Sequence, residues 1–317
     1  MSQAIRSAAA GILAAALWGV AEAESTSRRV GAHDTAAPLE SPLSAPSHVL
    51  PTGLSVVVLI DDAWHVMIAT ESGVDLVPDV SYPRNVTYHR GADRLAWIGA
   101  DGRLRERALA TGRTTTLGDA SSSARYTQPA YAPDGRWLDA VELPGGKSRT
   151  TRIVGFDLDS GERHRLVAKR TAQFEPQRTP DGRLHYTTAL CVDDCPGMIW
   201  ELWEKDLVEG RQRQLTLQNA VATHPKLGED GWLYFSSNAA GDGFHIWRVR
   251  PEPGAPPEPL TQGAVRDSDP APTPDGSVYF IRRRADGVDL MRLADGEEET
   301  VSLDARIRDL RDLEAGP

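Results

Sequence analysis

An eight-residue motif that recurs four times at nearly constant spacing is the strongest constraint on the fold. Each copy begins with a polar residue and a proline and ends with Asp-Gly, and the copies occupy residues 128–135, 175–182, 224–231 and 269–276. Their first prolines are 47, 49 and 45 residues apart. Self-similarity at this period is typical of stacked structural repeats. Because these windows lack a 3.6-residue apolar period, the motif predicts blades of a β-propeller rather than pairs of helices.

Each repeat contains four short segments in which β-branched and aromatic residues dominate, which predicts a four-stranded sheet. In the first repeat the Asp-Gly pair favours a tight turn, and further strands are expected at 137–141, 152–156 and 164–166. One such sheet cannot bury both of its faces, so neighbouring repeats must stack. Two weaker repeats precede these four. We therefore predict an all-β, six-bladed β-propeller over residues 53–304, closed so that only short sheet edges remain.

Residues 1–23 have the features of a secretory signal peptide. Arg6 supplies a positive charge, residues 8–20 form an apolar run, and residues 21–23 fit a small-x-small cleavage site. A membrane anchor is the alternative, but the run is too short to span a bilayer. No other apolar stretch approaches that length. The sequence thus predicts an exported protein without membrane insertion, and export in a Gram-negative bacterium would place it in the periplasm.

Two further segments flank the predicted propeller. Residues 24–52 are rich in Ser, Ala and Pro, and we expect a disordered linker because they cannot bury enough surface to offset ordering entropy. Residues 305–317 are charged with spaced leucines, which indicates a C-terminal tail, either a short helix or frayed. The net charge of −10 argues against binding of nucleic acid or of an anionic membrane, since both need a basic surface.

The two cysteines, Cys191 and Cys195, are expected to form a disulfide in an oxidising compartment. Such a bond would close a very small loop and would mainly stiffen its own turn, because a short loop removes little chain entropy. A redox site would need Cys-x-x-Cys near a βαβ unit, and the sequence has neither. Metal binding and unpaired thiols are the remaining alternatives.

The complete repeat reads Pro-x-x-x-Pro-Asp-Gly, an apolar strand, a loop, Ile-Trp/Tyr-x-Val and Leu-Thr, and it resembles the propeller repeat of the TolB family. The best copy runs through residues 224–236, 245–249 and 260–261, and the resemblance covers residues 54–303. It implies a six-bladed propeller, as in TolB or in the gating propeller of prolyl-oligopeptidase-type peptidases. It also implies an envelope partner, such as a Pal-like protein or a peptide. Residues 24–52 stand where TolB carries an α/β domain.

The polar residue before each first proline is the main candidate for a site. In a propeller the first strand of each blade lines the central channel, so these residues should converge at one channel mouth. They are Gln128, Glu175, His224 and Asp269, with Asn85 as a looser equivalent. Three interpretations remain open: solvation of a wet channel, docking of a peptide or protein, and a cation held by Glu175, His224 and Asp269.

Loops between the second and third strands should open on the same face, where recognition is often found. Arg282, Arg283 and Arg284 lie in one of these loops and could pair with carboxylates of a partner. Alternatively, they alternate across an exposed hairpin.

The sequence contains no recognisable catalytic motif, such as His-Glu-x-x-His, Gly-x-Ser-x-Gly or a Walker loop. We therefore expect a monomeric, non-enzymatic binding or scaffold protein without cofactor or metal. One alternative is a metal-dependent propeller hydrolase or lactonase. Another is a gating or sensor propeller that acts beside a separately encoded peptidase.

Overall fold

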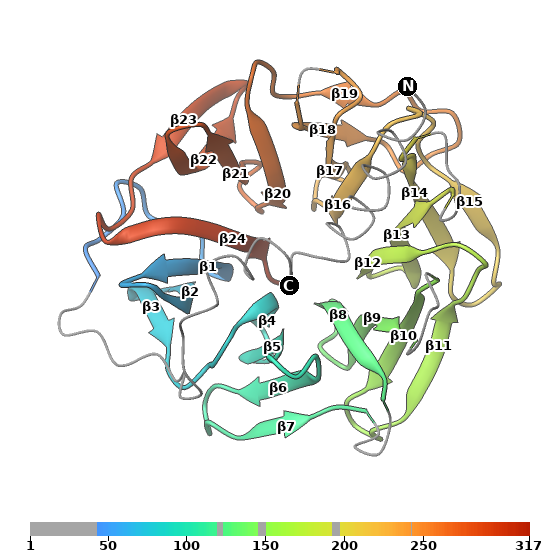
Figure 1. The fold of residues 1–317 in the computed structure, drawn as a ribbon, viewed down its shortest axis with the longest axis horizontal. Helices are drawn as coiled ribbons and strands as arrows, with labels where there is room; N and C mark the ends of the chain where they lie inside the picture. Colours follow the sequence, from blue (N-terminus) through green and yellow to red (C-terminus); the bar gives the residue numbers. More distant parts are fainter. Residues whose placement is uncertain (1–42, 119–122, 145–149, 192–196, 242) are drawn as a thin grey trace, which may run out of the picture.

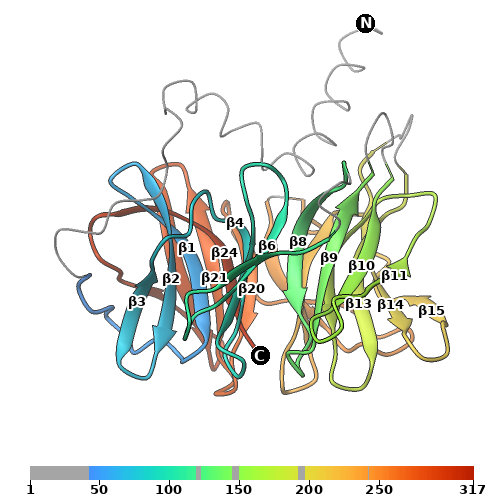
Figure 2. The same ribbon diagram turned by 90° about the horizontal axis from the view of Figure 1, so that it is seen from below.

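A computed structural model describes residues 43–118, 123–144, 150–191, 197–241 and 243–317. These residues form six four-stranded antiparallel sheets arranged as blades around a central axis (Figure 1). The strands run roughly along that axis, and each blade packs side by side with the next (Figure 2). This arrangement confirms the predicted six-bladed propeller. Within the described residues, no helix is long and apolar enough to cross a membrane.

The strands fall into four groups by their distance from the axis. The innermost are β4 (Arg84–His89), β8 (Arg125–Tyr131), β12 (Gln173–Arg178), β16 (Ala222–Leu227), β20 (Arg266–Pro272) and β24 (Ile307–Ala315). The second are β1 (Leu54–Ile60), β5 (Arg94–Ile98), β9 (Trp137–Leu143), β13 (Arg183–Ala189), β17 (Leu233–Ser237) and β21 (Val278–Arg284). The third are β2 (Ala63–Thr70), β6 (Leu104–Ala108), β10 (Arg152–Asp157), β14 (Trp200–Asp206), β18 (His245–Val249) and β22 (Gly287–Ala294). The outermost are β3 (Gly73–Val77), β7 (Thr114–Thr116), β11 (Arg163–Val167), β15 (Gln212–Gln214), β19 (Glu258–Pro259) and β23 (Glu297–Val301).

The repeated Asp-Gly pair forms the turn between the first and second strands of a blade. Asp134 Oδ1 accepts a hydrogen bond from the backbone N–H of Arg136 at 3.0 Å, and Asp275 repeats this contact with Ser277 at 3.1 Å. Gly135 adopts a φ of 66°, which a glycine reaches without the steric cost of a Cβ atom. The motif therefore marks one tight turn in each blade that carries it.

The repeated Leu-Thr pair joins the third strand of a blade to a buried carboxylate. Thr261 Oγ1 accepts a hydrogen bond from the Ile246 N–H at 2.9 Å and donates one to Asp267 at 2.6 Å. Thr216 makes the corresponding contacts with Leu202, at 2.9 Å, and with Glu201, at 2.5 Å. The threonine thus satisfies polar groups that would otherwise be costly to bury.

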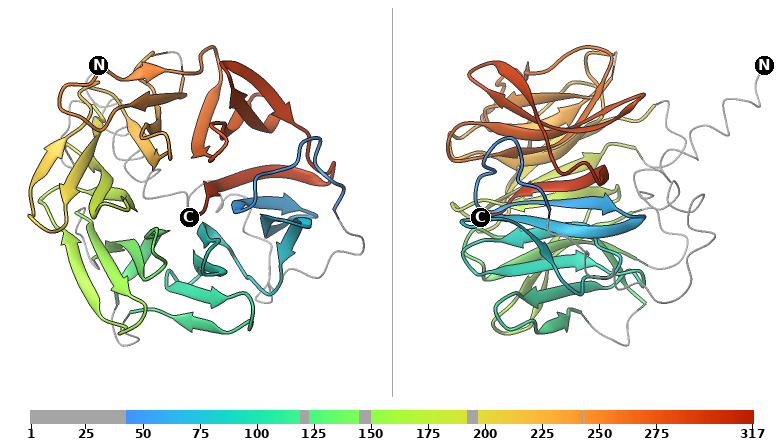
Figure 3. Two further views of the ribbon diagram at one scale, coloured as in Figure 1. Left: turned by 180° about the vertical axis from the view of Figure 1, so that it is seen from behind. Right: turned by 90° about the vertical axis from the view of Figure 1, so that its left-hand side faces the viewer.

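The C-terminal segment closes the ring. Residues 307–315 form β24, which pairs with β1, so the first and last parts of the described chain share one blade (Figures 1 and 3). The expectation of a helix or a frayed tail at 305–317 is wrong. Leu310 and Leu313 are both buried, and their three-residue spacing is compatible with a helix. In the structure a bulge at Asp312 adds one residue between them, so both leucines reach the core from a strand.

Part of the expected linker also packs on the propeller. Residues 24–42 lie outside the described residues, but residues 43–52 run beside the blade β20–β23. The Ser44 N–H and hydroxyl donate to Asp304 Oδ2 at 2.6 and 2.9 Å, and the Ser47 N–H donates to the Ser302 carbonyl at 2.9 Å. Leu50 is buried in the core beside β1 and β24. These contacts account for the difference from the expected disorder.

Ring closure by β24 can be tested with Leu310→Ala. The leucine is 2% exposed, so the change should lower the free energy of unfolding by about 2–5 kcal/mol. Arg308→Ala, on the same strand but with a side chain 62% exposed, should change it by less than about 0.5 kcal/mol. Urea denaturation measures both variants. Equal and small effects would show that residues 307–315 do not belong to the folded core.

Candidate functional site

Every one of the six inner strands contains a β-bulge that begins with a non-glycine residue at positive φ. At every bulge the inner strand has one residue more than its partner strand. The residues are Asn85 (48°), Gln128 (49°), Glu175 (54°), His224 (54°), Asp269 (55°) and Asp312 (52°). A left-handed conformation costs an L-residue about 1–2 kcal/mol. This strained backbone conformation recurs in every blade, and strain that is kept in this way often occurs at functional sites.

The local sequence explains four of these bulges. The residues at 128, 175, 224 and 269 each precede a proline, which has no N–H and is tolerated within sheets at bulges. Asn85 and Asp312 precede Val86 and Leu313 instead. Asp312 was missed by the sequence analysis because it has no proline and lies in the supposed tail. Asp312 lies 43 residues after Asp269, which is close to the spacing of 45 to 49 residues between the repeats. That spacing is the sequence signal that could have located it.

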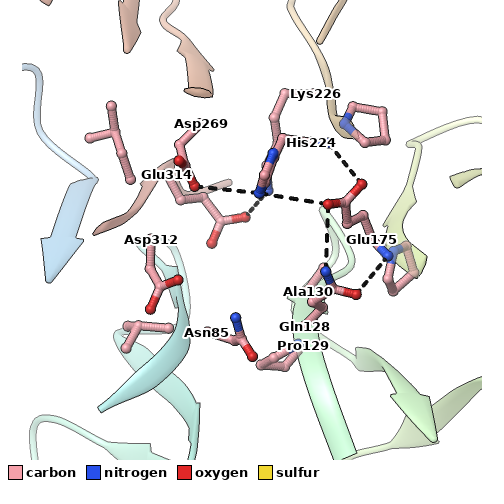
Figure 4. Close-up of a pocket in the computed structure, with 14 residues that line it drawn as sticks. Asn85, Gln128, Pro129, Ala130, Glu175, His224, Lys226, Asp269, Asp312 and Glu314 are labelled. Atoms are coloured by element: carbon pink, nitrogen blue, oxygen red, sulfur yellow. Dashed lines mark hydrogen bonds and ion pairs between the residues drawn. The ribbon is translucent and has the colours of Figure 1, made fainter. Parts of the chain in front are cut away.

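The six side chains converge inside the channel (Figure 4). The five candidates named from the sequence are thus brought together, part-way along the inner strands rather than at the rim. They line a cavity of about 80 Å³. Its lining comprises Asn85, Val86, Gln128, Pro129, Ala130, Glu175, Pro176, His224, Pro225, Lys226, Asp269, Asp312, Leu313 and Glu314. Pockets that enclose a typical small-molecule ligand measure roughly 300–1,000 Å³. This cavity therefore has room for a few waters or for one small polar group.

Several of these side chains bond to the backbone of the next blade. Gln128 Oε1 accepts a hydrogen bond from the Glu175 N–H at 3.2 Å, and Glu175 Oε2 accepts one from the His224 N–H at 2.8 Å. The carboxylate of Asp312 accepts from the backbone N–H groups of Asn85 and Val86. The bulged amides thus find acceptors on the preceding blade, and the channel residues connect the blades as well as lining the cavity.

His224 lies between two carboxylates of the channel. Its Nε2 is 3.6 Å from Glu175 Oε1 and 3.7 Å from Asp269 Oδ1, while 38% of its side chain remains exposed (Figure 4). Burial lowers the pKa of His224, but the charges of Glu175 and Asp269 outweigh it, so the pKa is raised above 6.5. The second basic group of the cavity, Lys226, is already paired with Glu314 at 2.5 Å.

Asp312 is a third carboxylate of the cavity, and it forms an ion pair with Arg311. Its Oδ2 is buried without a hydrogen-bond partner, and the Nε of Arg311 lies 4.0 Å away. Burial raises the pKa of Asp312, and it lowers the pKa of Arg311. After Lys226 with Glu314 and Arg311 with Asp312 are set aside as pairs, the carboxylates of Glu175 and Asp269 share one imidazole, so at least one negative charge stays unbalanced. The cavity therefore favours a positively charged guest.

The remaining candidates do not join this site. Arg282 is buried and bonds Asp267 at 2.7 and 2.8 Å, Arg283 bonds Asp309 at 2.6 Å, and Arg284 pairs with Asp289. All three lie in the strand β21, so the expectation that they belong to a loop is wrong, and each one forms an ion pair within the chain.

Two other expectations concern loops and metals. Cys191 borders the segment 192–196, and Cys195 lies outside the described residues, so the disulfide stays a prediction. Among the described residues, no group of three or more His, Cys, Asp or Glu side chains is arranged to hold a metal ion. The cation held by Glu175, His224 and Asp269 is therefore not supported by the geometry.

Comparisons with known proteins establish the fold. No family model and no curated protein match the sequence. Among solved structures, TolB from Acinetobacter baumannii is 18% identical with a TM-score of 0.66, and the match covers 83% of this chain and 66% of that one. A Mycobacterium tuberculosis puromycin-hydrolyzing peptidase is 16% identical with a TM-score of 0.54, over 81% of this chain and 46% of that one. An oligogalacturonate lyase in complex with manganese is 13% identical with a TM-score of 0.59, over 83% and 84%.

The chain is accordingly a TolB-like six-bladed propeller, as predicted. It spans less than two thirds of the TolB chain and less than half of the peptidase chain. Its structural neighbours include TolB proteins and enzymes, and one fold supports many activities. Function must therefore be argued from the channel.

The charge environment of His224 can be tested by NMR titration of its imidazole. The wild-type pKa should lie above 6.5, and Glu175→Gln or Asp269→Asn should lower it because each removes a nearby negative charge. Since folding raises this pKa, its stabilising contribution is full below the unfolded value and is lost as pH rises through the folded value. Asp62→Asn, which removes a charge from a side chain that is 89% exposed and lies outside the cavity, is the control. An unchanged pKa in both acidic-residue variants would place the imidazole away from these carboxylates.

Proposed function

We propose that this protein is a non-enzymatic binding module of the periplasm, which holds a peptide or protein partner at its propeller channel by one cationic side chain. The observation that carries this proposal is the excess of carboxylates around the cavity. Glu175 and Asp269 share a single imidazole, that of His224, as their counter-charge. A lysine or arginine head group would supply the missing positive charge, and complementary charge of this kind gives specificity.

The dimensions of the cavity support a side-chain guest. Its volume of about 80 Å³ matches the end of one side chain and is too small to enclose a sugar or a peptide. The body of a partner would then rest on the loops around the channel, while one residue inserts. The preformed bulges favour such binding because the acidic groups need little reordering when the guest arrives.

The cellular setting of this proposal comes from the sequence. The predicted signal peptide at residues 1–23 would deliver the chain to the periplasm. The resemblance to TolB supports a partner from the cell envelope, of which a Pal-like protein is one candidate. We propose that the module works as a monomer and without a cofactor.

Partner recovery from a periplasmic extract tests the proposal. A tagged Glu175→Gln/Asp269→Asn double variant should recover the partner at least about tenfold less than wild type, because it loses two charges of the cavity. The matched control is Asp62→Asn/Asp159→Asn, which removes two charges from side chains that are 89% and 75% exposed elsewhere. Equal recovery by all three proteins would place the binding surface outside the channel.

A further inference from the structure

The position of His224 bears on how binding at the channel is regulated. A cationic guest would take the space near the oxygens of Glu175 and Asp269, which are the groups that His224 faces at 3.6 and 3.7 Å. Those distances exceed a normal hydrogen bond, so the imidazole interacts with both carboxylates by charge without being fixed to either. Because 38% of the side chain is exposed, it is also accessible from the channel.

We propose that His224 gates the channel by protonation: the imidazolium competes with the cationic group of the partner for Glu175 and Asp269, and the neutral imidazole leaves them available. This inference rests on the proposed function, since it concerns the same cavity. At low pH the cavity then carries its own cation. At higher pH the site has unbalanced negative charge and binds the guest more tightly.

Four charged groups, from four strands, act on the imidazole of His224. Glu175 on β12 and Asp269 on β20 favour the imidazolium, and Asp312 on β24 adds a weaker effect of the same sign. Lys226 on β16 opposes protonation, but it is paired with Glu314. Burial lowers the pKa of His224, but the acidic neighbours outweigh burial, so the pKa is raised above 6.5.

The reciprocity of linked equilibria makes the competition measurable. If protonation of His224 weakens binding of a cation by some factor, binding of the cation must weaken the binding of the proton to His224 by the same factor, which lowers the pKa. Two positive charges about 4 Å apart in a water-like medium repel by about 1 kcal/mol, which corresponds to about a fivefold change, and less screening increases it. A change of fivefold or more is therefore expected.

The probe is N-acetyl-lysine amide, which keeps one positive charge between pH 5.5 and 8.5. Its affinity for the full-length protein should rise by about fivefold or more across that interval, and saturating probe should lower the pKa of His224 in an NMR titration. In His224→Gln the affinity should be independent of pH and should exceed that of wild type at pH 5.5. Glutamine suits this backbone because Gln128 occupies the equivalent bulge at a φ of 49°.

The possible outcomes separate the gate from the proposed function. Probe binding that is independent of pH in wild type, or that depends on pH equally in His224→Gln, overturns the gate and keeps the channel as a cation site. Equal pH dependence in wild type and His224→Gln would implicate Asp312, because its protonation would also weaken cation binding. Absence of binding by wild type at every pH overturns the proposed function and the gate together. A circular dichroism melt of His224→Gln establishes that it is folded, and the wild-type pKa shift tests the gate without any variant.

Discussion

Hydrogen bonds from bulged amides to side chains on the preceding blade are the interaction on which the channel depends. A bulge takes a residue out of the ladder between strands, so its N–H needs another acceptor. Gln128, Glu175 and Asp312 supply that acceptor for the amides of Glu175, His224 and Asn85. The polar groups that stabilise the strained backbone are therefore the groups that face the cavity. Structural and binding roles coincide in the same side chains.

This coincidence explains how an acidic cavity persists inside a packed protein. Burying carboxylates is costly unless hydrogen bonds or opposite charges compensate. Glu175 receives hydrogen bonds from the Thr187 hydroxyl and the His224 N–H, each at 2.8 Å, and Glu314 is paired with Lys226. Compensation is incomplete around Asp269, whose counter-charge is the partly exposed imidazole of His224 that it shares with Glu175. That remaining imbalance is what a cationic guest would relieve.

The sequence predicted the fold well because propeller blades carry a local, repeated signature. The prolines that follow residues 128, 175, 224 and 269 identified both the inner strand of each blade and the polar residue that faces the channel. Asp312 was not predicted as a channel residue because its bulge has no proline and the leucines beside it have a spacing that is typical of a helix. The contacts between blades could not be predicted, because the direction of each side chain follows from a positive φ that sequence patterns do not reveal. The pairing of Arg282 with Asp267 likewise depends on the register of β20 and β21.

Residue-resolved hydrogen exchange of the His224 amide tests the bonding between blades most directly. The account predicts slow exchange in wild type and much faster exchange in Glu175→Ala. A hydrogen bond to a charged group contributes about 1.5–3 kcal/mol, so an acceleration of about tenfold to a hundredfold is expected. The amide of Phe235, within β17, should keep its wild-type rate in the same sample. An unchanged rate at His224 would contradict the account, because Glu175 would then not be the acceptor that holds the bulge.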